Sequence, residues 1–198
     1  NQTMVLILAI GIGTFLISTL YFTKDILLAK TSIGNNSDEA NIILLDVQTE
    51  QKEGVINTVI PKGLEVIDNI PIVTMRMHRI KGELANDIRK DTASTMNRWI
   101  LNHEFRATYR DALAVSEELI EGTWIKEIEE GQPVLISITD NIARDADLKI
   151  GDPIVFNIQG VLMETTIGSI RKVDWGRMQL NFSVVFPTGV LENAPQFS

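Results

Sequence analysis

The chain opens with a long apolar run, which is followed by segments in which polar and apolar residues alternate. Met4 to Thr23 contains no charged side chain. As a helix this run would be about 30 Å long, at about 1.5 Å per residue, which matches the hydrocarbon core of a bilayer. We therefore predict a transmembrane helix with its flank at residues 1–30. A cleaved signal peptide is the alternative, but the run has neither a basic start nor an A-x-A-like exit.

Small residues within the predicted span suggest contact with other helices. Ala9 and Gly13 are about one helical turn apart, as are Thr14 and Ser18. Such spacing gives a face on which another helix backbone can approach closely. The alternative is composition alone, because Gly, Ser and Thr are common in membrane helices.

The residues after the span give two signals. Lys24 and Lys30 would by themselves place this end in the cytoplasm, because positive charge is favoured inside, but two lysines are a weak signal. Residues 31–40 are rich in Ser, Gly and Asn, which predicts a linker. We expect a folded domain at residues 41–198.

The domain is predicted to open with a strand-helix-strand unit. Residues 41–48 form a short apolar run typical of a buried strand. Thr49 can cap a helix whose apolar face includes Val55 and Val59, and Pro61 and Gly63 would end it. Apolar and polar residues then alternate over 72–79, which predicts a strand with one face in the core.

The middle of the chain is less regular and predicts an inserted subdomain at residues 82–130. Its start is polar and unperiodic, and a short helix is expected around 96–101. Alternation over 104–110 predicts a strand with Phe105, Ala107 and Tyr109 on one side.

The C-terminal part is predicted to be rich in β-strands. Strands are expected at 134–138, 154–158, 163–173 and 179–186, with a short helix at 140–146. The fold class is therefore α+β: a transmembrane helix, then a mixed α/β domain with a strand-helix-strand unit, an insertion and a β-rich end.

Charge and composition exclude several function classes. The formal net charge is −8, and it becomes −9 for residues 31–198 once Lys24, Lys30 and Asp25 are left out (−8 − 2 + 1). Such an acidic domain repels phosphate backbones, so no nucleic-acid partner is expected. The absence of cysteine excludes disulfides, thiolate nucleophiles and Cys-ligated zinc.

The remaining chemical groups predict no catalytic site, metal or cofactor. His78 and His103 lack metal-ligand spacing. No serine lies in a G-x-S-x-G elbow, and no phosphate-binding loop with a Walker A pattern is present. The acidic groups around Glu117 and Glu127 are interpreted as solvated faces. We therefore do not expect an enzyme.

One cluster near the C-terminus is a candidate site. Arg171, Asp174 and Trp175 are predicted to lie in a link between two strands, where Asp174 can pair with Arg171 or Arg177. The cluster is either a hairpin corner held by local hydrogen bonds or a docking surface for a partner.

Several segments together resemble a known family. These are Glu104-Phe-Arg-Ala-Thr-Tyr-Arg-Asp111, Leu148-Lys-Ile-Gly-Asp152, Arg171-Lys-Val-Asp-Trp175 and Phe186-Pro-Thr-Gly189. With the order of elements, they resemble the extracytoplasmic domains of FtsX-like, MacB-type permeases of ABC transporters. The closest resemblance is to the permease associated with lysophospholipase or esterase genes.

The resemblance implies a location and partners. It implies a bacterial inner-membrane protein with residues 31–198 in the periplasm, against the two-lysine signal. It implies a separate cytoplasmic ATPase subunit, a second permease copy or pseudo-symmetric half, and a periplasmic protein or hydrolase as a further partner. The implied role is to relay ATP-driven motion to export or extraction of a hydrophobic or lipid-related substrate. The alternatives are a single-span, membrane-anchored ligand-sensing or interaction domain and, less favoured, a pilin-like subunit.

Overall fold

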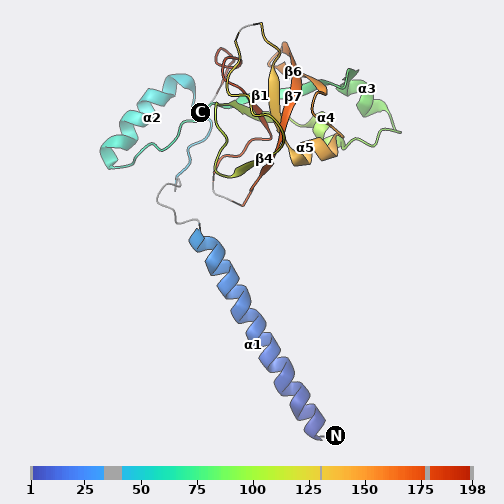
Figure 1. The fold of residues 1–198 in the computed structure, drawn as a ribbon. Helices are drawn as coiled ribbons and strands as arrows, with labels where there is room; N and C mark the ends of the chain where they lie inside the picture. The colour runs from blue at the N-terminus through green and yellow to red at the C-terminus, as the bar shows by residue number, and fades with distance from the viewer. Residues whose placement is uncertain (1, 34–41, 130, 177–178, 197–198) are drawn as a thin grey trace. The chain divides into compact units, whose positions relative to one another are not determined.

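The chain consists of two compact units, Asn1–Asn41 and Ile42–Ser198. The structure is a computed structural model that describes residues 2–33, 42–129, 131–176 and 179–196 (Figure 1).

The first unit is one long helix, α1 (Gln2–Ile33). Within the described residues it is the one helix that is long and apolar enough to cross a membrane, over Gln2–Ala29, by length and composition. The hydroxyls of Thr14 and Thr19 donate to the carbonyls of Ile10 and Phe15, at 2.9 and 2.8 Å. These polar groups are thereby satisfied inside the helix, as a lipid surrounding requires. The helix continues through Ile33, so the predicted linker starts too early, and the rest of that linker lies outside the described residues.

The second unit is built on a ring of six hydrogen-bonded strands. In order of pairing the ring is β1–β3–β8–β5–β7–β6, and β6 pairs again with β1, which closes it. Two of the neighbouring pairs, β3 with β8 and β5 with β7, are parallel, and the other pairs are antiparallel. The strands are β1 (Val73–Ile80), β3 (Phe105–Tyr109), β5 (Leu135–Thr139), β6 (Pro153–Ile158), β7 (Val161–Val173) and β8 (Val184–Phe186).

Two further strands extend the barrel. The short β2 (Glu83–Leu84) pairs with the end of β1. β4 (Glu117–Gly122) pairs with the second half of β7, whose first half pairs with β6. The length of β7 thus allows one strand to hold three neighbours, β4, β5 and β6.

The inside of the ring is filled by apolar side chains that alternate along the strands. In β1 the buried residues are Val73, Met75 and Met77, as the alternation predicts, and Ile80, which follows a register shift between Met77 and Arg79. Phe156 of β6 and Phe186 of β8 meet across the core with their ring centroids 6.0 Å apart. A small barrel of this kind is a packed core and not a channel.

Three short helices cover one part of the barrel. They are α3 (Ala85–Lys90), α4 (Arg98–Asn102) and α5 (Asp140–Asp145). The Asn97 side chain caps α4, and the indole of Trp99 donates to Asp145 at 2.8 Å, which ties α4 to α5. The short helices predicted around 96–101 and 140–146 are therefore confirmed.

The segment before β1 differs from the prediction. Residues 42–47 form no strand and are mostly exposed, so the predicted buried strand at 41–48 is wrong. The predicted helix does form, as α2 (Lys52–Val59) between short 3-10 turns at Thr49–Gln51 and Ile60–Lys62. In Figure 1, α2 stands apart from the barrel at the tip of an arm, residues 42–70.

The remaining strand predictions are mostly confirmed, with two changes. The range 82–130 includes β3 and β4, which belong to the common sheet, so the predicted subdomain boundary at residue 130 does not coincide with a boundary in that sheet. The last strand is shorter than the predicted 179–186, since β8 begins at Val184.

A close backbone approach follows β8 and yields a test. Gly189 has φ +93°, and a Cβ at this position would lie 2.3 Å from the Ile128 carbonyl oxygen. Gly160 has φ +104° with nothing within 4 Å of an added Cβ, so it is the matched control. We expect Gly160→Ala to cost about 1–2 kcal/mol through backbone strain alone. Gly189→Ala should cost a further 1–3 kcal/mol or so, because the added atom overlaps backbone.

The measurement is urea unfolding of the detergent-solubilised chain, followed by tryptophan fluorescence. Equal unfolding midpoints for the two variants would contradict the close approach of Gly189 to Ile128.

Candidate functional site

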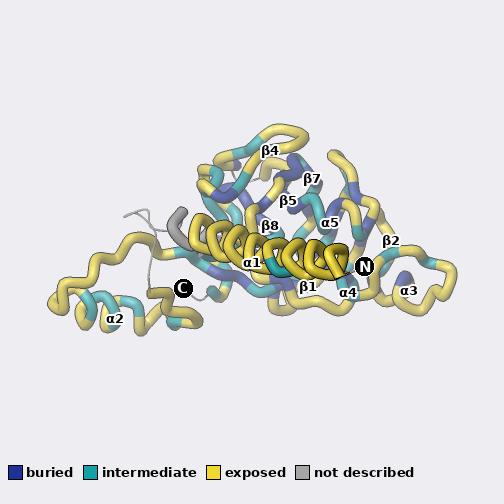
Figure 2. Tube along the Cα trace, turned by 90° about the horizontal axis from the view of Figure 1, so that it is seen from below, coloured by how far each residue is buried: buried dark blue, intermediate teal, exposed yellow. Residues whose placement is uncertain are grey.

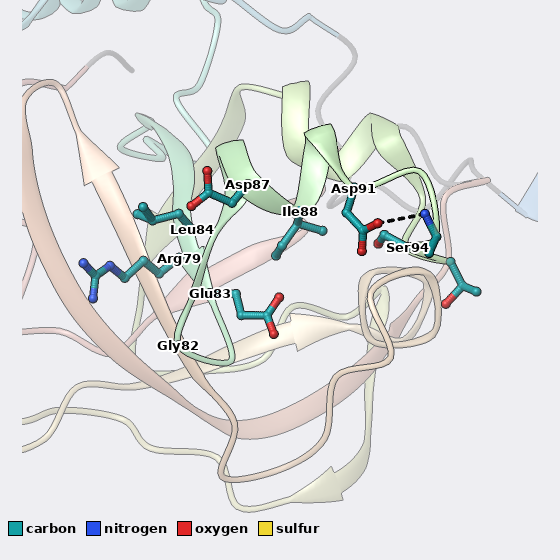
Figure 3. Close-up of a pocket in the computed structure, with 10 residues that line it drawn as sticks. Arg79, Gly82, Glu83, Leu84, Asp87, Ile88, Asp91 and Ser94 are labelled. Atoms are coloured by element: carbon teal, nitrogen blue, oxygen red, sulfur yellow. Dashed lines mark hydrogen bonds between the residues drawn. The ribbon is translucent and has the colours of Figure 1, made fainter.

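A shallow groove of about 710 Å³ lies where α3 meets the end of β1 (Figure 3). Its charged residues are Arg79, Glu83, Asp87 and Asp91. The Asp91 carboxylate already accepts a hydrogen bond from the Ala93 backbone amide at 2.8 Å. These carboxylates are not grouped to bind a metal, since among the described residues no three or more His, Cys, Asp or Glu side chains lie where they could hold one ion. The groove is open and polar, and its lining has no histidine or nucleophile–base pair for catalysis.

A more completely hydrogen-bonded polar site lies instead where β4 pairs with β7, and it contains a fully buried charge. Arg171 of β7 has a fully buried side chain, and the Glu117 side chain from β4 is 1% exposed. The Arg171 Nε lies 3.1 Å from Glu117 Oε1. Arg110, which follows β3, contacts the other carboxylate oxygen of Glu117 at 2.5 Å. One carboxylate is therefore shared by two guanidinium groups.

Backbone oxygens satisfy the rest of the Arg171 guanidinium. One terminal nitrogen donates to the Ser137 carbonyl at 3.1 Å, and the other donates to the Phe182 carbonyl. Arg171 thereby joins β7 to β4, to β5 and to the segment before β8. A buried charge requires such a complete set of partners, because its loss of hydration is costly.

A second layer of hydrogen bonds encloses this ion pair. Ser116, next to Glu117, donates to the Asn181 side chain at 2.9 Å and accepts from the Gln179 side chain at 2.7 Å. The Asp174 backbone amide donates to the Ser116 carbonyl at 2.8 Å. These bonds attach the segment before β8 to the start of β4.

The burial of Arg171 affects its pKa. Desolvation lowers the pKa of the Arg171 guanidinium from its ordinary value to about 10, while Glu117 acts in the opposite direction. Arg171 is therefore charged at pH 7, and its contact with Glu117 is ionic.

Two polar atoms beside this network have no hydrogen-bond partner among the described residues. They are Arg110 Nε and Thr108 Oγ1, which come from alternate positions at the end of β3. An enclosed polar position of this kind suits an ordered water molecule.

The structure separates the three residues of the predicted corner. Arg171 lies inside β7 and not in the link after it, and Glu117 is its carboxylate partner. Asp174 lies after β7, where its carboxylate accepts from the Gly176 amide at 3.0 Å, a local turn bond. Trp175 is 52% exposed. Asp174 therefore makes a local hydrogen bond of the kind expected at a hairpin corner. A role of Trp175 in docking a partner stays a prediction.

The other predicted positions are the small residues of α1 and the two histidines. Ala9 and Gly13 lie in α1, and nothing lies within 4 Å of a Cβ built on Gly13. Their role in helix packing stays a prediction. His103 packs edge-on against Trp99 and Phe105, with ring centroids 5.3 and 4.9 Å away. His78 lies in β1, on a different element.

Sequence reasoning missed the pairing of Glu117 with Arg171. The acidic pattern predicts a solvated face that includes Glu117, and only its neighbour Glu118 is exposed as predicted. The sequence does contain one signal for a buried charge. Arg171 directly follows Ile170 within a strand that is rich in β-branched residues. A charge at a buried position of a strand requires an opposite charge nearby.

The shared carboxylate can be tested with a matched pair of variants. Glu117→Gln keeps the side-chain shape but leaves Arg171 as a buried charge without its counter-ion. We expect a loss of about 3–5 kcal/mol in the free energy of unfolding. The exposed neighbour is the control, and Glu118→Gln should change stability by less than about 0.5 kcal/mol. Urea unfolding measures both, and a Glu117→Gln variant as stable as the control would contradict the buried network.

Comparison with known proteins points to one relative. No protein-family model matches the sequence, and no solved structure matches the chain. Over 188 residues, 95% of this chain, the sequence is 22% identical to the uncharacterized ABC transporter permease YbbP of Escherichia coli (strain K12). The matched part is 22% of that relative, so the chain spans about a fifth of its length. The chain is thus similar to a segment of an ABC transporter permease.

Proposed function

We propose that this chain is a membrane helix and the adjoining extracytoplasmic domain of an ABC transporter permease. The observation that carries the proposal is the similarity to such a permease over 95% of the chain. The long apolar α1 supports it, since a permease is embedded in the membrane. At finer detail, the proposed family is the FtsX-like, MacB-type group, closest to the permease associated with lysophospholipase or esterase genes.

The proposed role of the domain is mechanical. ATP hydrolysis belongs to a separate cytoplasmic subunit, and the membrane helices pass the resulting motion to the domain. A barrel that closes on itself and is packed with apolar side chains deforms little, which suits an element that moves as a rigid body. The motion would drive export or extraction of a hydrophobic or lipid-related substrate. Further proposed partners are a second permease copy or pseudo-symmetric half and a periplasmic protein or hydrolase.

The proposed location is the bacterial inner membrane, with the barrel outside the cytoplasm, and single cysteines test it. The chain has no natural cysteine. Val115 is 84% exposed, so Val115→Cys in a full-length protein whose cysteines outside this chain are replaced by serine should react with a membrane-impermeant maleimide in intact cells. Ile138, fully buried in β5, is the control, and Ile138→Cys should react only after denaturation. Labelling of Val115→Cys only after cell lysis would place the barrel in the cytoplasm, as Lys24 and Lys30 alone would suggest.

The ATPase partner is tested by purification. The full-length protein, tagged and extracted from its native membrane in mild detergent, should retain a second subunit that hydrolyses ATP. An unrelated membrane protein with the same tag is the control for background ATPase activity. Recovery of a signalling protein without ATPase activity would contradict the permease proposal and favour an anchored sensing domain.

A further inference from the structure

The arm, residues 42–70, exposes many large apolar side chains to solvent. Eight of them are between 36% and 58% exposed, and Figure 2 shows the segments on either side of α2 mostly in yellow, with α2 itself in yellow and teal. Four are consecutive and stand at the start of the arm. The set, called here the apolar arm residues, is Ile42, Ile43, Leu44, Leu45, Ile60, Leu64, Val66 and Ile67.

The root of the arm is fixed to the barrel, but α2 is not. Asp46 pairs with Arg106 of β3 at 3.7 Å, and the Thr49 hydroxyl donates to the Gln196 carbonyl at 3.4 Å. The main contacts of α2 are with its own flanking 3-10 turns. Because a helix of eight residues is marginal in water without tertiary packing, α2 requires another surface to stabilise it.

Chain connectivity limits what that surface is. Ile42 follows the last residue of α1, Ile33, by nine residues, which span at most about 30 Å when fully extended. If α1 crosses the bilayer, the first apolar arm residues cannot move far from the lipid surface. A segment tethered in this way meets the surface at a high effective concentration, so modest apolar contacts are enough to hold it.

We infer that the arm lies on the bilayer, with the apolar arm residues at the boundary between lipid headgroups and acyl chains. The sequence Ile42 to Leu45 has no charge, and the charged side chains of α2, Lys52 and Glu53, stand at its start where they can face water. Side chains bound at such an interface enter it by about 5–10 Å. This inference rests on the part of the proposed function that makes α1 a membrane span, and it does not depend on transport.

Single-cysteine variants carrying an environment-sensitive fluorophore test the inference in the whole chain, reconstituted in phosphatidylcholine vesicles. Leu44→Cys and Val66→Cys report on the arm. Lys90→Cys is the control in water, because α3 lies on the opposite side of the barrel from α2 in both views (Figures 1 and 2). Phe15→Cys, in the middle of α1, is the control in lipid.

Lipids with a quencher near the headgroup should reduce the fluorescence of both arm labels by about twofold and leave the Lys90→Cys label unchanged. Lipids with a quencher deep in the acyl chains should act on Phe15→Cys and not on the arm. Arm labels quenched by aqueous iodide as strongly as Lys90→Cys would overturn the inference, because the arm would be in water. Arm labels protected from both lipid and aqueous quenchers would also overturn it, in favour of a protein surface.

The lipid control separates this inference from the proposed function. If Phe15→Cys is not quenched by deep lipids, α1 is not a membrane span, and the proposed function fails together with the inference. If Phe15→Cys is quenched and the arm labels are not, the inference alone fails.

Discussion

The structure depends on keeping one buried charge satisfied. Arg171 has no exposed surface, and a guanidinium without partners in such a place would cost several kcal/mol. Its partners come from three separate parts of the chain: the Glu117 carboxylate, the Ser137 carbonyl and the Phe182 carbonyl. Each partner must therefore stay in place for the charge to be tolerated. The pairing of β4 with β7 and the path of the chain before β8 follow from this requirement.

An ion pair of this kind specifies an arrangement more than it adds stability. A well-packed apolar group of the same volume is often as stable as a buried ion pair, whereas a pair with one member removed is not. The stability of the barrel comes from the apolar residues inside the ring, such as Phe156 and Phe186. The network of Arg171 instead excludes other registers of β4, since a shift by one residue would point Glu117 away from it.

The sequence predicted the strands whose two faces differ, and the predicted strand that does not form came from a run without such alternation. Alternation over residues 72–79 and 104–110 identified β1 and β3, because each strand has one face in the barrel. The apolar run at 41–48 has no period, so its composition fits a buried strand and an exposed binding segment equally well. The ring closure was not predictable, because pairing between β1 and β6 joins residues about 80 positions apart. The same limit hid the pairing of Glu117 with Arg171.

The exposed apolar residues of the arm are informative because of where they lie, and composition alone does not show this. The barrel already has a complete core, and the apolar arm residues add nothing to it. Exposed apolar side chains that folding does not require mark a surface for something outside the folded unit. The barrel and the arm therefore differ: the closed ring fixes a shape, and the arm carries the exposed apolar residues that we propose meet the bilayer. The proposed mechanical role requires both, because a rigid body transmits displacement only through the points at which it is held.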